Sequence, residues 1–115
     1  MIFVIDDDAV MANCIKKSCG EREVMIFGDG IAAMNALDDR GLPSLIFLDI
    51  LLTGPDGFTF LNELVSYSDT AKIPVVVITS LELGTKDLSA YGVVGVLNKE
   101  TMMPQEIGDY AKKYS

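Results

Sequence analysis

Five short runs of apolar residues recur along the chain, separated by stretches in which apolar positions have helical spacing. The runs cover residues 2–5, 24–27, 45–48, 75–78 and 93–97. Runs of this length without polar alternation are typical of strands in a parallel sheet, where helices cover both faces. The pattern therefore predicts an α/β fold, a doubly wound five-stranded parallel sheet with helices on both faces.

Between these strands, apolar residues repeat every three or four positions, as they do on one side of a helix. Five helices are expected: from about Val10 to Ser18, over 31–37, from Phe58 to Val65, a weak one over 85–91, and a last one after Pro104. Proline is a favoured first residue of a helix, and Gly41 and Pro43 close the second one.

Polar residues follow directly after four of the predicted strands. They are Asp6 and Asp7, then Asp49, Thr79 and Lys99. Taken singly, each has an ordinary explanation, because aspartate starts turns and caps helices, and threonine is common in strands. The carboxyl ends of parallel strands meet at one edge, however, and ligands bind there in open α/β sheets. Their shared position therefore indicates a functional site.

The composition limits the chemistry of this site. The chain has 115 residues, 50% of them hydrophobic, which suits one domain over residues 1–115. It contains no histidine, which excludes Ser-His-Asp and Cys-His catalysis and most zinc sites. The net charge of −8 opposes nucleic-acid binding.

The location is predicted from two further features. No apolar stretch reaches the ~18 residues of a membrane helix. Met1 leads directly into the first strand without the basic region and cleavage site of a secretory signal. A cytoplasmic protein without membrane contact is therefore expected.

The charges of the predicted site indicate a divalent cation. Of the three consecutive acids, Asp8 is expected to cap the following helix, which leaves Asp6 and Asp7 to join Asp49. The negative charge of three carboxylates exceeds the positive charge of the Lys99 ammonium by the amount that one divalent cation carries, so such an ion would neutralise the site. Oxygen ligands in a small cleft favour Mg²⁺.

These motifs resemble the receiver domains of two-component response regulators, the CheY-like family. The resemblance covers nearly the whole chain and depends on residues 2–8, 48–58, 73–80 and 95–99. It implies a flavodoxin-like fold of the receiver type. It also implies that Asp49 accepts a phosphoryl group from the phosphohistidine of a sensor histidine kinase or a phosphotransfer protein.

The resemblance assigns the remaining site residues as well. Mg²⁺ would be bound by Asp6, Asp7, Asp49 and the backbone carbonyl of Leu51, while Thr79 and Lys99 would contact the phosphoryl oxygens. The protein would then be a signalling module, not an enzyme, limited to self-phosphotransfer and slow self-dephosphorylation. Phosphorylation would reshape the surface of the fourth and fifth strands and helices, which binds a downstream protein, with no direct contact to nucleic acid.

Two leucines bear on the lifetime of the phosphorylated state. Leu51 and Leu81 stand at positions that flank the phosphoryl group in the family, and their apolar side chains are expected to exclude water and slow hydrolysis. The alternative is that both leucines pack under neighbouring loops, which would leave hydrolysis at a typical rate.

Three departures from the family pattern affect the switch. Glu100 follows Lys99 where proline is usual, so a trans peptide bond is expected there. Val96 replaces an aromatic residue that moves with the switch in the family, and Thr53 replaces a second proline. A second hypothesis therefore stays open, a pseudo-receiver that acts as a phosphorylation-independent protein-interaction module.

Two further function classes fit the sequence less well. A phosphatase with an aspartyl nucleophile needs a second acid at the position of Leu51. A flavodoxin-like electron carrier needs a phosphate-binding loop after the first strand, where three aspartates stand instead.

Overall fold

A five-stranded parallel sheet forms the centre of the protein. The computed structural model describes residues 1–50, 57–80 and 88–114. The strands lie in the order β2-β1-β3-β4-β5 and all pair in parallel. Their bounds are β1 Ile2–Ile5, β2 Val24–Phe27, β3 Leu45–Asp49, β4 Val75–Thr79 and β5 Val93–Asn98. The predicted doubly wound α/β fold is confirmed.

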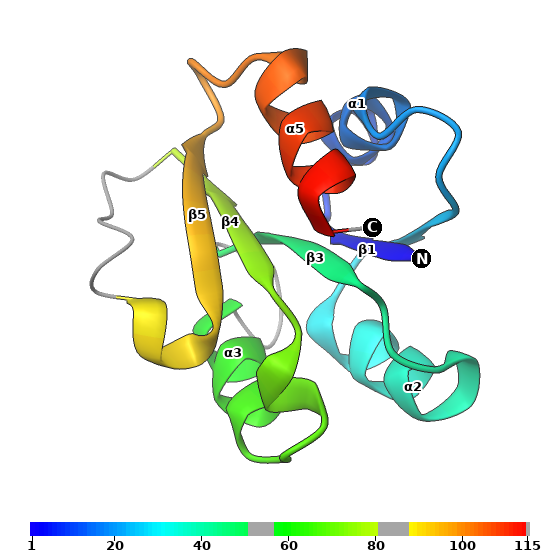
Figure 1. Ribbon diagram of the computed structural model, residues 1–115, viewed down its shortest axis with the longest axis vertical. Helices are drawn as coiled ribbons and strands as arrows, with labels where there is room; N and C mark the ends of the chain where they lie inside the picture. The colour runs from blue at the N-terminus through cyan, green and yellow to red at the C-terminus, as the bar shows by residue number, and fades with distance from the viewer. Residues whose placement is uncertain (51–56, 81–87, 115) are drawn as a thin grey trace.

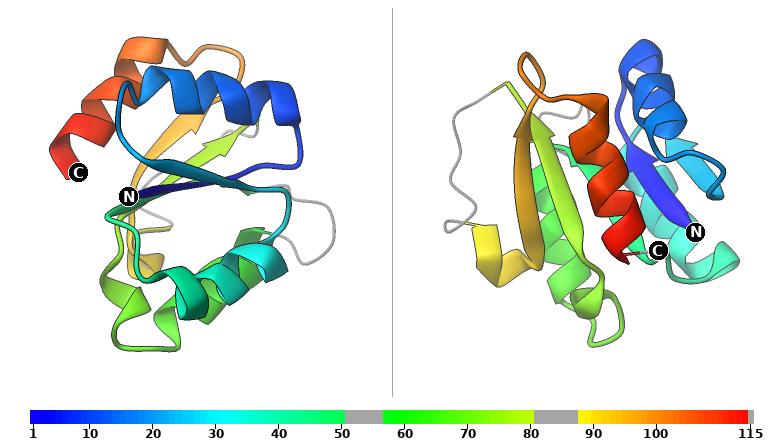
Figure 2. Two further views of the ribbon diagram at one scale, coloured as in Figure 1. Left: turned by 90° about the vertical axis from the view of Figure 1, so that its right-hand side faces the viewer. Right: turned by 45° about the horizontal axis from the view of Figure 1, so that its top comes forward.

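Four α-helices in the described residues cover the two faces of this sheet (Figure 1). Helices α1 (Ala9–Ser18) and α5 (Pro104–Tyr114) lie on one face, and α2 (Gly30–Arg40) and α3 (Gly57–Val65) lie on the other. The left view of Figure 2 shows these two layers on either side of the strands. None of the described helices is long and apolar enough to cross a membrane.

Residues 85–87 of the predicted weak helix over 85–91 lie outside the described residues. Its described end forms a short 3-10 helix, η2 (Ser89–Tyr91), which leads into β5. A second 3-10 helix, η1 (Thr70–Lys72), precedes β4.

The strand side chains alternate between two apolar clusters, one under each helix layer. Phe3 and Leu48 pack toward α2 and α3, while Val4 and Phe47 pack toward α1 and α5. Every residue of β1, β3 and β4 is buried, which explains why these segments show no polar alternation in the sequence. The edge strand β2 is partly exposed.

Local capping fixes where α1 begins. The Asp8 carboxylate accepts hydrogen bonds from the backbone N–H groups of Val10 and Met11, at 3.0 and 3.2 Å. The prediction that Asp8 caps this helix is confirmed, and its carboxylate thereby satisfies amides that have no partner within the helix.

The contact between β5 and α5 depends on a glycine. A Cβ atom at Gly95 would lie 2.0 Å from the Tyr110 hydroxyl oxygen, so the tyrosine occupies the space above the glycine. The next residue, Val96, packs against the apolar cluster on the opposite face of the sheet. An aromatic ring from α5 therefore covers this part of β5, next to the position where the family usually has its aromatic residue.

Candidate functional site

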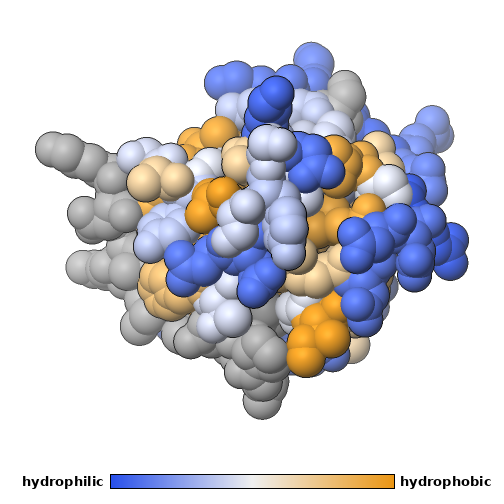
Figure 3. Space-filling model, turned by 90° about the horizontal axis from the view of Figure 1, so that it is seen from below, coloured by the Kyte–Doolittle hydropathy of each residue, from blue (hydrophilic) through white to orange (hydrophobic). Residues whose placement is uncertain are grey.

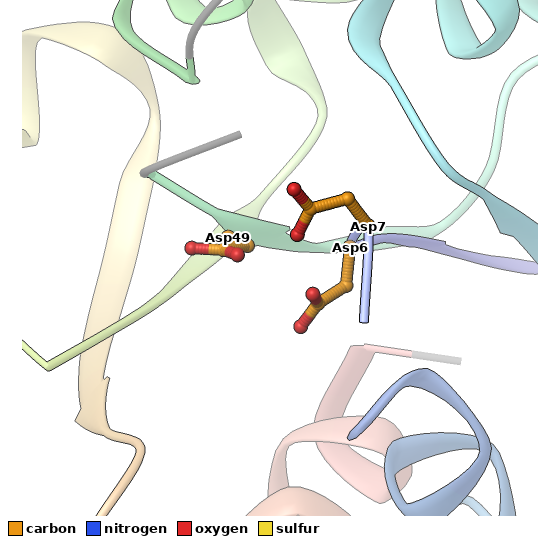
Figure 4. Close-up of side chains that lie close together, drawn as sticks. All are labelled: Asp6, Asp7 and Asp49. Atoms are coloured by element: carbon orange, nitrogen blue, oxygen red, sulfur yellow. The ribbon is translucent and has the colours of Figure 1, made fainter. Parts of the chain in front are cut away.

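Strand pairing brings Asp6 and Asp49 to the same edge of the sheet. Ile5 of β1 lies opposite Leu48 of β3 in the parallel register, so the residue that follows each comes level with the other. Both acids then lie at the carboxyl ends of their strands, the usual ligand-binding edge of this architecture. Figure 4 shows Asp6, Asp7 and Asp49 gathered there.

Three carboxylates form a compact cluster at this edge. One oxygen from each of Asp6, Asp7 and Asp49 lies within 4.8 Å of the others. Asp6 and Asp49 are only 3% and 4% exposed, whereas Asp7 is exposed. Like charges this close repel each other, and the repulsion is strongest for buried groups. The cluster is therefore suited to binding a cation.

Lys99 provides one compensating charge. Its Nζ atom donates a hydrogen bond to Asp49 Oδ2 at 2.9 Å and lies 3.6 Å from Asp6 Oδ2. Burial by itself would lower the pKa of Lys99, but the hydrogen bond to Asp49 and the charges of both acids outweigh it and raise the pKa. The ammonium therefore stays charged, and one positive charge faces three carboxylates.

Asp6 has an oxygen that lacks a hydrogen bond. Its Oδ1 atom accepts the backbone N–H of Asp8 at 2.9 Å, but its buried Oδ2 atom accepts none from the described residues. Burial raises the pKa of Asp6 to about 6, against the opposing effects of the Asp8 hydrogen bond and Lys99. A buried carboxylate oxygen without a donor suits a metal ligand, so the residues present fit a divalent cation.

Thr79 ends β4 beside β5. Its side chain is fully buried, and its backbone carbonyl accepts the N–H of Lys99 at 3.0 Å. The structure thus joins Thr79 and Lys99 through the backbone. The carbonyl of Leu51 and the side chain of Leu81 lie outside the described residues.

The loop after Lys99 is built by Asn98, which the sequence analysis did not single out. The Asn98 Oδ1 atom accepts the backbone N–H of Glu100 at 2.8 Å, and the Asn98 carbonyl accepts that of Met102 at 2.8 Å. Proline at position 100 would lack the first of these donors. No cis peptide bond occurs in the described residues, so the predicted trans bond at Lys99–Glu100 is confirmed. The sequence did carry a signal for this turn. Asparagine often starts a turn by accepting the backbone N–H two residues on, and Glu100, unlike proline, has that N–H.

The strand that carries Asp49 is held closely by α3. The Gly57 N–H donates to the carbonyl of Ile50 at 3.1 Å, and a Cβ atom at Gly57 would lie 2.6 Å from the Ile50 Cα. Only glycine allows the helix to begin this close to the residue after Asp49.

Comparison with known sequences identifies proteins that are similar to this chain. The family model of the response regulator receiver domain matches residues 2–110. Response regulator PleD of Caulobacter vibrioides is 37% identical over 83 residues, which cover 70% of this chain and 18% of that protein. Response regulator Rcp1 of Synechocystis sp. is 36% identical over 80 residues, covering 64% of this chain and 54% of that protein. The chain thus spans about half the length of Rcp1 and less than a fifth of the length of PleD.

Solved structures show the same fold. The receiver domain of NtrX from Brucella abortus superposes with a TM-score of 0.81 at 26% identity, covering 99% of this chain and 97% of that one. The Mn²⁺-bound form of Rcp1 gives a TM-score of 0.73 at 26% identity, covering 97% of this chain and 88% of that one.

Proposed function

Because the chain belongs to the response regulator receiver domain family of two-component signalling, we propose that Asp49 is its phosphoacceptor. The phosphoryl donor is the phosphohistidine of a sensor histidine kinase or a phosphotransfer protein. The supporting observation is the buried Asp49 carboxylate, hydrogen bonded to Lys99 at 2.9 Å and adjoined by Asp6 and Asp7. In this proposal residues 1–115 form one receiver domain.

The arrangement of side chains suits phosphoryl transfer. An Asp49 oxygen attacks phosphorus in line, and the new P–O bond forms as the P–N bond to histidine breaks, with the electron pair passing to the imidazole. The Lys99 ammonium, already at Asp49, compensates charge on the transferred oxygens. The Thr79 hydroxyl is proposed as a second donor to those oxygens.

We assign Mg²⁺ to the carboxylates of Asp6, Asp7 and Asp49, with the Leu51 carbonyl as a further ligand by family resemblance. The buried Asp6 Oδ2 atom, without a hydrogen bond from the described residues, supports this assignment. When bound, the ion supplies positive charge that offsets the negative phosphoryl oxygens. The relative Rcp1 has been solved in a Mn²⁺-bound form.

The output is proposed to be a change in the surface of β4, β5, α5 and the segment between β4 and β5, which binds a downstream protein in the cytoplasm. Apart from accepting the phosphoryl group and slowly losing it, the domain catalyses no reaction. Val96 at the aromatic position favours the alternative, an interaction module that works without phosphorylation.

Treatment with acetyl phosphate and Mg²⁺ distinguishes a phosphorylated receiver from an interaction module that works without phosphorylation. Mass spectrometry of the intact protein is expected to show one added phosphoryl group, which is absent from Asp49→Asn and present in Asp39→Asn, an exposed aspartate of α2. A phosphorylated Asp49→Asn protein would contradict the site assignment. A wild-type protein that accepts no phosphoryl group would favour the pseudo-receiver.

A further inference from the structure

Two adjoining hollows lie on the face of the sheet opposite α1 and α5. The first lies between α2 and α3, and the second lies between the C-terminal half of α2 and the segment that follows α3. The first has a volume of about 300 Å³ and begins at Gly30 and Ile31. The second has a volume of about 240 Å³ and extends to Leu42. Met34 and Asn35 line both, so the hollows join along α2. Together they form one feature, the α2–α3 groove, which lies between residues 30–42 and 59–70.

The α2–α3 groove exposes apolar side chains that the core does not use. The core face of α2 includes small buried residues such as Ala33 and Ala36. Along the groove, by contrast, Ile31 is 57% exposed, Leu42 46% and Tyr67 56%. Figure 3, which views the molecule from below, shows several apolar patches among hydrophilic groups on this face. Covering these side chains would be favourable.

The charged side chains that line the α2–α3 groove are all acidic. Glu63 lines the first hollow, and Asp38 and Asp69 line the second. All three are exposed, and none forms an ion pair with another described residue. The described lining residues include no lysine or arginine. Exposed apolar side chains beside acidic ones are complementary to an apolar segment flanked by basic residues.

We propose that the α2–α3 groove binds an amphipathic helix of a partner protein, with large apolar residues on one side and lysine or arginine beside them. The eleven residues of α2 extend about 16 Å, which matches a partner helix of about three turns. This surface is separate from that of β4, β5 and α5, because none of the residues that line the groove belongs to those elements.

The test uses a panel of synthetic peptide helices, each with leucines at positions i, i+3, i+4 and i+7. One group carries lysines beside the leucines, a second carries glutamates, and a third has the sequence of the first group scrambled. Each is titrated into ¹⁵N-labelled protein and followed by NMR. Lysine peptides are expected to shift the amide signals of Ile31, Asn35 and Glu63, and the other two groups are not.

Two substitutions in the α2–α3 groove, each with a matched control, separate the contributions of charge and of apolar contact to peptide binding. Glu63→Lys is expected to weaken lysine-peptide binding about threefold, as a rim charge does, whereas Glu23→Lys, an exposed position before β2, leaves it unchanged. Ile31→Ser is expected to weaken it about fivefold, whereas Val10→Ser on α1 does not.

Three outcomes would overturn the proposal. The first is that no lysine peptide shifts the α2–α3 groove signals, or that glutamate peptides shift them equally. The second is that Glu23→Lys weakens binding as much as Glu63→Lys, because the charge would then act through the whole protein. The third is that the groove signals shift with protein concentration alone, since the occupant would then be a second copy of this chain.

Discussion

Replacing Asp6 with asparagine is expected to stabilise the metal-free domain at neutral pH. Residue Asp6 is 3% exposed, and burial raises the pKa of its carboxyl group from an ordinary 3.8 to about 6. That difference corresponds to about 3 kcal/mol of unfavourable free energy for ionised Asp6 in the folded state. Asparagine keeps the shape of the side chain and an oxygen that can accept the Asp8 N–H, but it carries no charge.

The amide also has a cost. Its NH₂ group would occupy the place of Asp6 Oδ2, which faces the Lys99 ammonium and has no hydrogen-bond partner among the described residues. An unsatisfied buried donor costs ~1 kcal/mol. We therefore expect the free energy of unfolding to rise by ~2 kcal/mol at pH 7.5.

The pH dependence gives a second test with a definite sign. Between about pH 3.8 and pH 6 the folded state keeps the Asp6 proton that the unfolded chain has already lost. The contribution of Asp6 to stability therefore falls as the pH rises through this window and stays low above it. The asparagine side chain of the variant has no proton to lose, so the advantage of the variant should be large at pH 7.5 and absent at pH 4.0.

Urea denaturation in EDTA at both pH values measures these differences. Asp7→Asn is the matched control, because it makes the same chemical change at an exposed neighbour and should alter stability much less. Added Mg²⁺ should stabilise the wild type more than Asp6→Asn. The reasoning is refuted if Asp6→Asn is no more stable than the wild type at pH 7.5, or if its gain is equal at the two pH values.

Three further substitutions test other contacts. Lys99→Ala should leave Mg²⁺ affinity unchanged or higher, because it removes a competing positive charge. It should slow phosphorylation by acetyl phosphate ~10-fold or more. A loss of Mg²⁺ binding in a titration would show instead that Lys99 has a structural role. Asn98→Ala should lower the free energy of unfolding by ~1 kcal/mol and slow phosphorylation. Asn98→Ser, which keeps a hydrogen-bond acceptor, should reduce stability and phosphorylation rate less. Equal losses in the two variants would contradict the role of the Asn98 turn. Gly57→Ala should destabilise by ~2 kcal/mol or more in urea, because its Cβ would meet the Ile50 backbone at 2.6 Å. Gly28→Ala should not destabilise the protein, because a Cβ atom at Gly28 would lie in open space. Equal losses of stability in the two variants would refute this reasoning.

The strands and helices, and their order along the chain, could be predicted without the structure. Five apolar runs became β1 to β5, and the helical spacing located α1, α2, α3 and α5 within a few residues. These features depend on periodicity and on caps such as Asp8, which act between neighbours in the chain and can therefore be recognised without knowing the fold. The same local pattern placed the acids and Lys99 at strand ends, because the end of an apolar run marks the end of a strand.

Which of these side chains meet depends on how distant parts of the chain pack in three dimensions. Lys99 is fifty residues from Asp49 in sequence, and their hydrogen bond exists because β5, β4 and β3 lie side by side. The raised pKa of Asp6 likewise depends on how the chain buries it, which its two acidic neighbours in sequence do not reveal. The tyrosine over Gly95 and the groove beside α2 also arise between distant segments. Distances, burial and charge between such segments are set by packing, so local periodicity carries no information about them.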